Sequence, residues 1–105
     1  MLPVKIDRQL IQLHRDDNIA CLKRTIEKGT TLTIGGRKFT VRMTIGLGHK
    51  IALRDISKGE NIIKFGAPIG SAIERILAGE HVHLHNMKSD YLPTYTLEDG
   101  FKYGN

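Results

Sequence analysis

Apolar and polar residues alternate in several short runs of this chain, which is the period of two that a half-buried β-strand requires. The clearest case joins residues 31–34 (Thr-Leu-Thr-Ile) to residues 37–41 (Arg-Lys-Phe-Thr-Val) through Gly35-Gly36. Adjacent glycines between two alternating runs are typical of a tight hairpin, because the turns that match twisted strands need positive φ angles. The sequence therefore predicts a β-hairpin over residues 31–41.

Further strands are predicted over residues 18–24, 49–56, 60–65 and 71–76, with one or two short strands before His14. In the second of these segments, Ile51 and Leu53 are expected to share one face. Residues 66–70 are expected to form a rigid turn, because Pro68 fixes its φ angle between flexible glycines. The polar residues 16–18 predict another turn. The candidate core residues near the N-terminus are Val4, Ile6, Leu10, Ile11 and Leu13.

One short pattern occurs three times, with an isoleucine three residues before a glycine and an aliphatic residue three residues after it. Its glycines are Gly29, Gly59 and Gly79, and their unequal spacing excludes a solenoid. We interpret the pattern as one glycine-centred β-turn used repeatedly, with chance similarity in a glycine-rich β protein as the alternative. No long helical period is present, so the fold is expected to be mostly β with little helix.

Three histidines lie at alternate positions within residues 79–86, at His81, His83 and His85. If this segment is one strand, the imidazoles form a row on one face while Val82 and Leu84 turn into the core. Such a row favours metal binding or proton transfer, although a polar, solvent-facing strand is the alternative. Neighbours would stand about 6.6 Å apart and the outer pair about 13 Å apart. One ion would therefore contact two of them and need ligands from elsewhere in the fold or from a partner.

Composition limits the classes of protein to which this chain can belong. Its 105 residues, 40% of them hydrophobic, suffice for one small domain. The net charge of +5 favours an acidic small molecule or acidic protein surface, but dispersed basic residues argue against nucleic-acid binding. A single cysteine and the lack of a long apolar run predict a cytoplasmic chain that contacts no membrane. Phosphate-loop, CxxC and GxSxG patterns are absent from the sequence.

Three ordered segments, residues 48–56, 64–70 and 79–86, closely resemble the N-terminal domain of the altronate and galactarate dehydratase family. The resemblance implies the SAF, or β-clip, fold over residues 1–88, followed by a C-terminal tail over residues 89–105 that is flexible or docks on a partner. Members of that family remove water from a sugar acid with a divalent metal such as iron, and similar small subunits occur in sulfolactate sulfo-lyase. In single-chain members this domain precedes a much larger catalytic portion.

The resemblance thus implies a small lyase subunit that is inactive alone and is completed by a large catalytic subunit. Eliminating a hydroxyl next to a carboxylate requires a base, a Lewis acid and a proton donor. The expected cofactor is Fe²⁺ or Mn²⁺, held partly by the partner. A noncatalytic β-clip module that binds carbohydrate or aids assembly is the alternative, and homo-oligomerisation is left open. The expected site residues are His83 and His85 as catalytic groups, His81, His83 and His85 as metal ligands, and His49, Lys50 and Asn86 as substrate contacts. The alternatives are that His49 and Lys50 are solvated turn residues and that Asn86 caps a turn.

Overall fold

The computed structural model describes residues 5–90, which form short β-strands and no helix. This confirms the prediction of a mostly β fold. Within the same residues, no helix is long and apolar enough to cross a membrane. The strands are β1 (Leu10–Ile11), β2 (Ile19–Leu22), β3 (Thr31–Ile34), β4 (Arg37–Thr40), β5 (Lys50–Ala52), β6 (Asn61–Lys64), β7 (Ala67–Ala72), β8 (His81–Val82) and β9 (Met87–Lys88).

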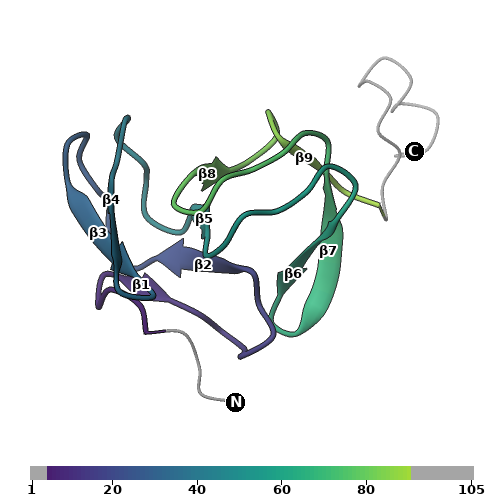
Figure 1. Ribbon diagram of the computed structural model, residues 1–105, viewed down its shortest axis with the longest axis horizontal. Helices are drawn as coiled ribbons and strands as arrows, with labels where there is room; N and C mark the ends of the chain where they lie inside the picture. The colour runs from purple at the N-terminus through teal and green to yellow at the C-terminus, as the bar shows by residue number, and fades with distance from the viewer. Residues whose placement is uncertain (1–4, 91–105) are drawn as a thin grey trace, which may run out of the picture.

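A four-stranded antiparallel sheet in the order β1-β2-β5-β8 occupies the middle of the molecule. The β3–β4 hairpin lies on one side of this sheet and the β6–β7 hairpin on the other, as Figure 1 shows. Strand β9 joins the second hairpin by pairing with β7. The predicted hairpin over residues 31–41 is confirmed, with Gly35 and Gly36 at φ angles of 58° and 80°.

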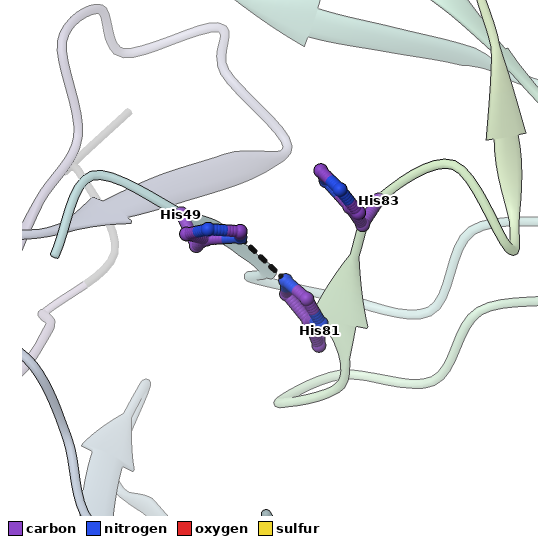
Figure 2. Close-up of side chains that lie close together, drawn as sticks. All are labelled: His49, His81 and His83. Atoms are coloured by element: carbon purple, nitrogen blue, oxygen red, sulfur yellow. Dashed lines mark hydrogen bonds between the residues drawn. The ribbon is translucent and has the colours of Figure 1, made fainter. Parts of the chain in front are cut away.

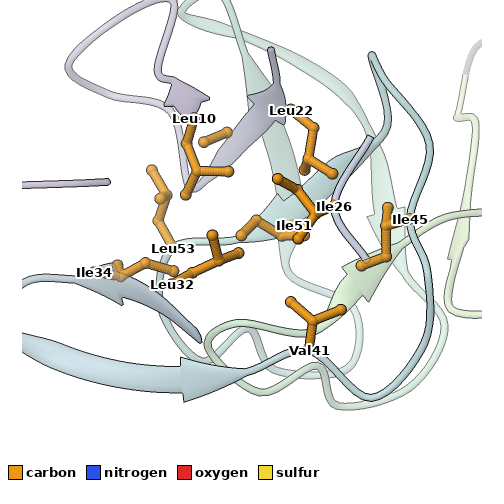
Figure 3. Packing of buried hydrophobic residues seen from close by; sticks show 10 residues of the cluster. Leu10, Leu22, Ile26, Leu32, Ile34, Val41, Ile45, Ile51 and Leu53 are labelled. Carbon is orange, nitrogen blue, oxygen red and sulfur yellow. The ribbon is translucent and has the colours of Figure 1, made fainter. Parts of the chain in front are cut away.

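The central sheet buries both of its faces, so two separate apolar clusters form. Leu22 and Ile51 pack on the side of the β3–β4 hairpin (Figure 3). Ala20 belongs to the same cluster, and so does Leu53, as its alternation with Ile51 predicts. Ile19, Ala52 and Val82 face the opposite side, with Ile62 and Ala72 of the second hairpin. Strands buried on both faces read as continuous apolar runs, which explains the sequence Ile-Ala-Cys-Leu of β2.

The repeated glycine pattern forms one kind of turn, as predicted, and the structure adds a fourth copy that the sequence analysis missed. Each turn is closed by a backbone hydrogen bond of 2.9–3.1 Å across four residues. The third residue of each turn has a positive φ angle that glycine adopts without strain. These residues are Gly29, Gly48, Gly59 and Gly79, with φ angles of 91°, 84°, 86° and 86°.

The isoleucines that precede these turns pair with one another at the base of each hairpin. Ile26 bridges to Ile45 below the first hairpin, and Ile56 bridges to Ile76 below the second. All four are almost completely buried. The part of the chain that the structure describes therefore contains two similar units of hairpin and paired turns, and both units use β5.

Several details of the sequence prediction are wrong. Residues 66–70 are not a rigid turn: the chain turns at Phe65 and Gly66, and β7 runs through Pro68. A register shift between Ile62 and Ile63 accompanies this proline, which cannot donate to the ladder. Of the candidate core residues, Leu10 is buried, whereas Ile11 and Leu13 are each 40% exposed. Val4 and most of the predicted tail, residues 91–105, lie outside the described residues.

The turn at residues 16–18 buries two polar side chains that hold the second hairpin. The Asn18 side chain donates from Nδ2 to the Asn61 carbonyl oxygen, and its Oδ1 accepts from the Ile63 backbone amide, both at 2.8 Å. The Asp17 carboxylate accepts from the amides of Phe65 and Gly66 at 2.9 and 2.7 Å. These bonds support the left-handed conformation of Phe65, whose φ angle is 56°.

Replacing Asn18 with alanine is expected to lower the free energy of unfolding by about 2–3 kcal/mol, because two buried backbone groups of β6 lose their partners. Chemical denaturation measures this change. Asn61→Ala is the matched control: its side chain is exposed and makes no hydrogen bond among residues 5–90, so we expect a change within about 0.5 kcal/mol. Equal losses for the two variants would contradict the role assigned to Asn18.

Candidate functional site

The register between β5 and β8 brings histidines from distant parts of the chain together. Ile51 pairs with His81, and Lys50 pairs with Val82. Continuing this antiparallel register places His49 opposite His83, on the same face of the sheet as His81. Figure 2 shows the three side chains close together; they come from the residue before β5, from β8 and from the residue that follows β8.

The predicted strand over residues 79–86 is wrong, because β8 ends at Val82 and the chain then turns. The side chain of Asn86 closes this turn: its Oδ1 accepts from the His83 amide at 2.9 Å, and its Nδ2 donates to the His81 carbonyl oxygen at 2.8 Å. Leu84 consequently points outward and is 78% exposed instead of lying in the core. Buried Asn86 thus has a turn-closing role, while substrate contact by this residue stays a prediction.

The turn gathers the histidines more closely than a straight strand does. The rings of His81 and His83 are stacked, with centroids 5.4 Å apart and an interplanar angle of 9°. The His85 ring lies 5.6 Å from the His81 ring, compared with about 13 Å for the outer residues of an extended row. The His49 ring lies 5.1 Å from His81 and 5.0 Å from His83.

Three of these imidazoles have a geometry that suits a metal ion. One ring nitrogen from each of His49, His81 and His83 lies within 4.8 Å of the others. The closest pair is His49 Nδ1 and His81 Nε2, at 3.0 Å (Figure 2). Two nitrogens that each lie about 2.1 Å from one ion, at a right angle, are about 3.0 Å apart. The distance between His49 Nδ1 and His81 Nε2 therefore fits two ligands of one metal ion as well as it fits a hydrogen bond.

The surroundings keep His81 neutral. Burial, followed by the neighbouring charges of His49, His83, His85 and Lys50, lowers the pKa of His81 from 6.5 to about 4. A neutral imidazole keeps the lone pair that a metal ligand requires. The second ring nitrogen of His81, Nδ1, is buried and has no hydrogen-bond partner among the described residues.

The structure brings most of the sequence-predicted site residues together but divides them differently. His49, predicted as a substrate contact, joins His81 and His83 in the group that suits a metal, whereas His85 lies outside that group. Lys50 follows His49 directly and is half-buried. Which of these residues contact metal or substrate stays a prediction.

A cleft of about 710 Å³ adjoins the histidines on the side of His81 and His85. It lies between β4 and the turn that leads to β8, and the sequence analysis missed the basic residues that line it. Arg37 and Lys38 come from β4, and Arg42 follows that strand. In the sequence these residues belong to a dispersed set of charges, so only the fold reveals that they lie beside the histidines.

Residues 8–90 match the family model described as the altronate/galactarate dehydratase SAF domain, and the chain belongs to that family. It is 43% identical over 96 residues to altronate dehydratase of Escherichia coli (strain K12). The aligned segment covers 90% of this chain and 19% of that protein. The chain is 41% identical over 83 residues to altronate dehydratase of Bacillus subtilis (strain 168), covering 79% of this chain and 17% of that protein. The chain therefore spans less than a fifth of the length of these relatives.

A second kind of relative has a more similar size. The chain is 44% identical over 52 residues to (2R)-sulfolactate sulfo-lyase subunit alpha of Chromohalobacter salexigens, covering 50% of this chain and 55% of that subunit. These comparisons bear out the family resemblance drawn from residues 48–56, 64–70 and 79–86.

The lowered pKa of His81 predicts a pH dependence of stability in the metal-free protein. Between about pH 6.5 and pH 4 the unfolded chain binds a proton at this residue and the folded chain does not, so stability falls as the pH is lowered through this range. Chemical denaturation at several pH values measures the effect. His81→Gln should lose less stability than the parent protein over this interval. Identical pH profiles for the parent and His81→Gln would contradict this assignment.

Proposed function

We propose that this chain is the SAF portion of a lyase that eliminates water from a sugar acid, and that His49, His81 and His83 hold a divalent metal at its active site. The observation that supports this most strongly is the convergence of three imidazole nitrogens within 4.8 Å in a domain of the altronate/galactarate dehydratase family. Fe²⁺ and Mn²⁺ are the metals we expect from the family resemblance, and imidazole is a ligand that suits iron.

Three protein ligands leave coordination positions open, which is typical of catalytic rather than structural metal sites. The metal, when bound, supplies a Lewis acid for the negative charge that develops on the substrate. His85 lies outside the ligand group and is exposed, so its imidazole is free to move a proton to or from the substrate. Lys50 carries a positive charge next to the ligand His49 and stays our predicted contact for the substrate carboxylate.

A larger catalytic portion is part of this proposal. The two altronate dehydratases are more than five times as long as the segment they share with this chain, and the sulfo-lyase relatives are named as alpha subunits. We therefore infer that this domain works together with a catalytic portion, in the same polypeptide or in a separate subunit. That portion would complete the metal coordination and most of the substrate site.

A carbon–sulfur lyase is the second candidate function. It is favoured by the match to (2R)-sulfolactate sulfo-lyase subunit alpha, at 44% identity over half of this chain. Both reactions remove a group from an acid substrate, so the same metal-holding histidines serve either one. The two functions differ in substrate and in whether water or sulfite leaves.

Metal binding tests the histidine site directly on the 105-residue chain. Titration with Mn²⁺, followed by electron paramagnetic resonance and calorimetry, is expected to show one site per chain. His49→Gln, His81→Gln and His83→Gln should each weaken binding by more than about 100-fold, because each removes a ligand rather than an outer-shell partner. His14→Gln is the matched control and should bind as the parent does. Unchanged affinity in all three cluster variants would overturn the site.

Activity tests the lyase assignment in the assembled enzyme. The protein isolated at low salt from its native cells, with its catalytic portion, is expected to dehydrate altronate or galactarate and to lose activity when a chelator removes the metal. Replacing both His83 and His85 with alanine should lower kcat by about 100-fold or more. Release of sulfite from sulfolactate, without dehydration, would select the second candidate. Full activity and metal content after the double substitution would show that these histidines are structural.

A further inference from the structure

We propose that the cleft beside the histidines is a carboxylate-binding subsite, in which Arg42 and Lys38 hold an acid group of the substrate. The proposal rests on the proposed lyase function and deepens it, because it names side chains of this domain for a second carboxylate, in addition to the one that Lys50 is predicted to contact. Arg42, Lys38, His81 and His85 all line this one cleft.

The shape of the cleft follows from close packing between the first hairpin and the turn at Gly79. The Phe39 ring lies against Gly79 so closely that an added Cβ there would come within 2.8 Å of it. Phe39 therefore forms an apolar wall together with Leu77 from the same turn. The volume of about 710 Å³ is within the usual range for small-molecule sites and leaves room for a six-carbon acid.

The charges in the cleft favour an anion. The side chains of Arg42 and Lys38 are exposed and make no hydrogen bond or ion pair within residues 5–90. The acid Asp55, in contrast, already accepts from the Ala78 amide at 2.9 Å and pairs with Arg75 at 3.4 Å. Because Arg75 does not line the cleft, it compensates Asp55 from outside.

The other charged side chains in the lining leave the net charge of the cleft positive. Glu80 already accepts from the Leu77 amide at 2.7 Å, and Glu74 is the third acid in the lining. The third cation is Arg37, whose guanidinium lies 5.0 Å from the centre of the Phe39 ring. With Asp55 neutralised, three cations face two acids.

The position of the two free cations explains why a carboxylate is the matching ligand. A planar guanidinium binds a carboxylate with two parallel hydrogen bonds, and a lysine adds a second positive charge. His81 and His85 line the same cleft, so an acid held by Arg42 and Lys38 shares that cleft with these two histidines. A neutral polyol of the same length lacks the group that these side chains recognise.

The test uses galactarate as the probe and galactitol, the neutral six-carbon polyol, as its matched control. Amide NMR shifts of the metal-free 105-residue chain are expected to move on addition of galactarate around residues 37–43 and 77–81, and not to move with galactitol. Arg42→Gln and Lys38→Gln should each weaken galactarate binding about tenfold, as the loss of one charge-assisted hydrogen bond predicts. Arg42→Lys should bind galactarate with an affinity between those of Arg42→Gln and the parent protein, because the positive charge stays while the paired hydrogen bonds are lost.

Arg24→Gln serves as the control variant, since Arg24 is exposed and does not line the cleft; it should bind as the parent does. No shift up to about 50 mM galactarate, or equal shifts with galactitol, would overturn the carboxylate subsite. Galactarate binding that is unchanged in both the Arg42 and Lys38 variants would overturn it as well. The experiment is done without metal, so its result is independent of the Mn²⁺ titration. Galactarate can fail to bind although Mn²⁺ binds the histidines, and galactarate can bind although Mn²⁺ does not.

Discussion

The pairing of β5 with β8 is the constraint on which the rest of this domain depends. It sets Ile51 against His81, and thereby fixes which residues enter the apolar clusters and which form the histidine site. A shift of one residue would turn His81 to the opposite face and would place Val82 beside the first hairpin. The register is held because Ile51 and Val82 are both completely buried, on opposite faces of the sheet. Core packing and site geometry are therefore two results of one alignment.

The sequence alone predicts part of the histidine site. Alternation correctly places His81 and His83 on one face, because that rule is local to a strand. The contribution of His49 depends on pairing between segments about thirty residues apart, which no local pattern contains. The sequence also conceals the end of β8: the Asn86 side chain closes the turn with two backbone hydrogen bonds, whereas alternation through Leu84 indicates that the strand continues.

In the fold as well, features set by local sequence are predictable, whereas features set by contacts between distant segments are not. The hairpin at Gly35-Gly36 and the glycine-centred turns are predictable because a positive φ angle is a local requirement that glycine meets. Pro68 misleads, since a proline between glycines usually indicates a turn, and here a register shift keeps it inside β7. The buried roles of Asp17 and Asn18 are also hidden, because their partners are backbone groups of the β6–β7 hairpin, more than forty residues away.

The two units of hairpin and paired turns have no boundary between them, because β5 is a member of both. Its Ile51 belongs to one apolar cluster and its Ala52 to the other. Loss of either hairpin would expose one face of this strand to water, so neither unit retains a complete core without the other. Such a domain is expected to unfold as a single cooperative body rather than in parts. The histidine cluster begins at the first residue before β5, so the position of His49 in it depends on a strand that both apolar clusters hold in place.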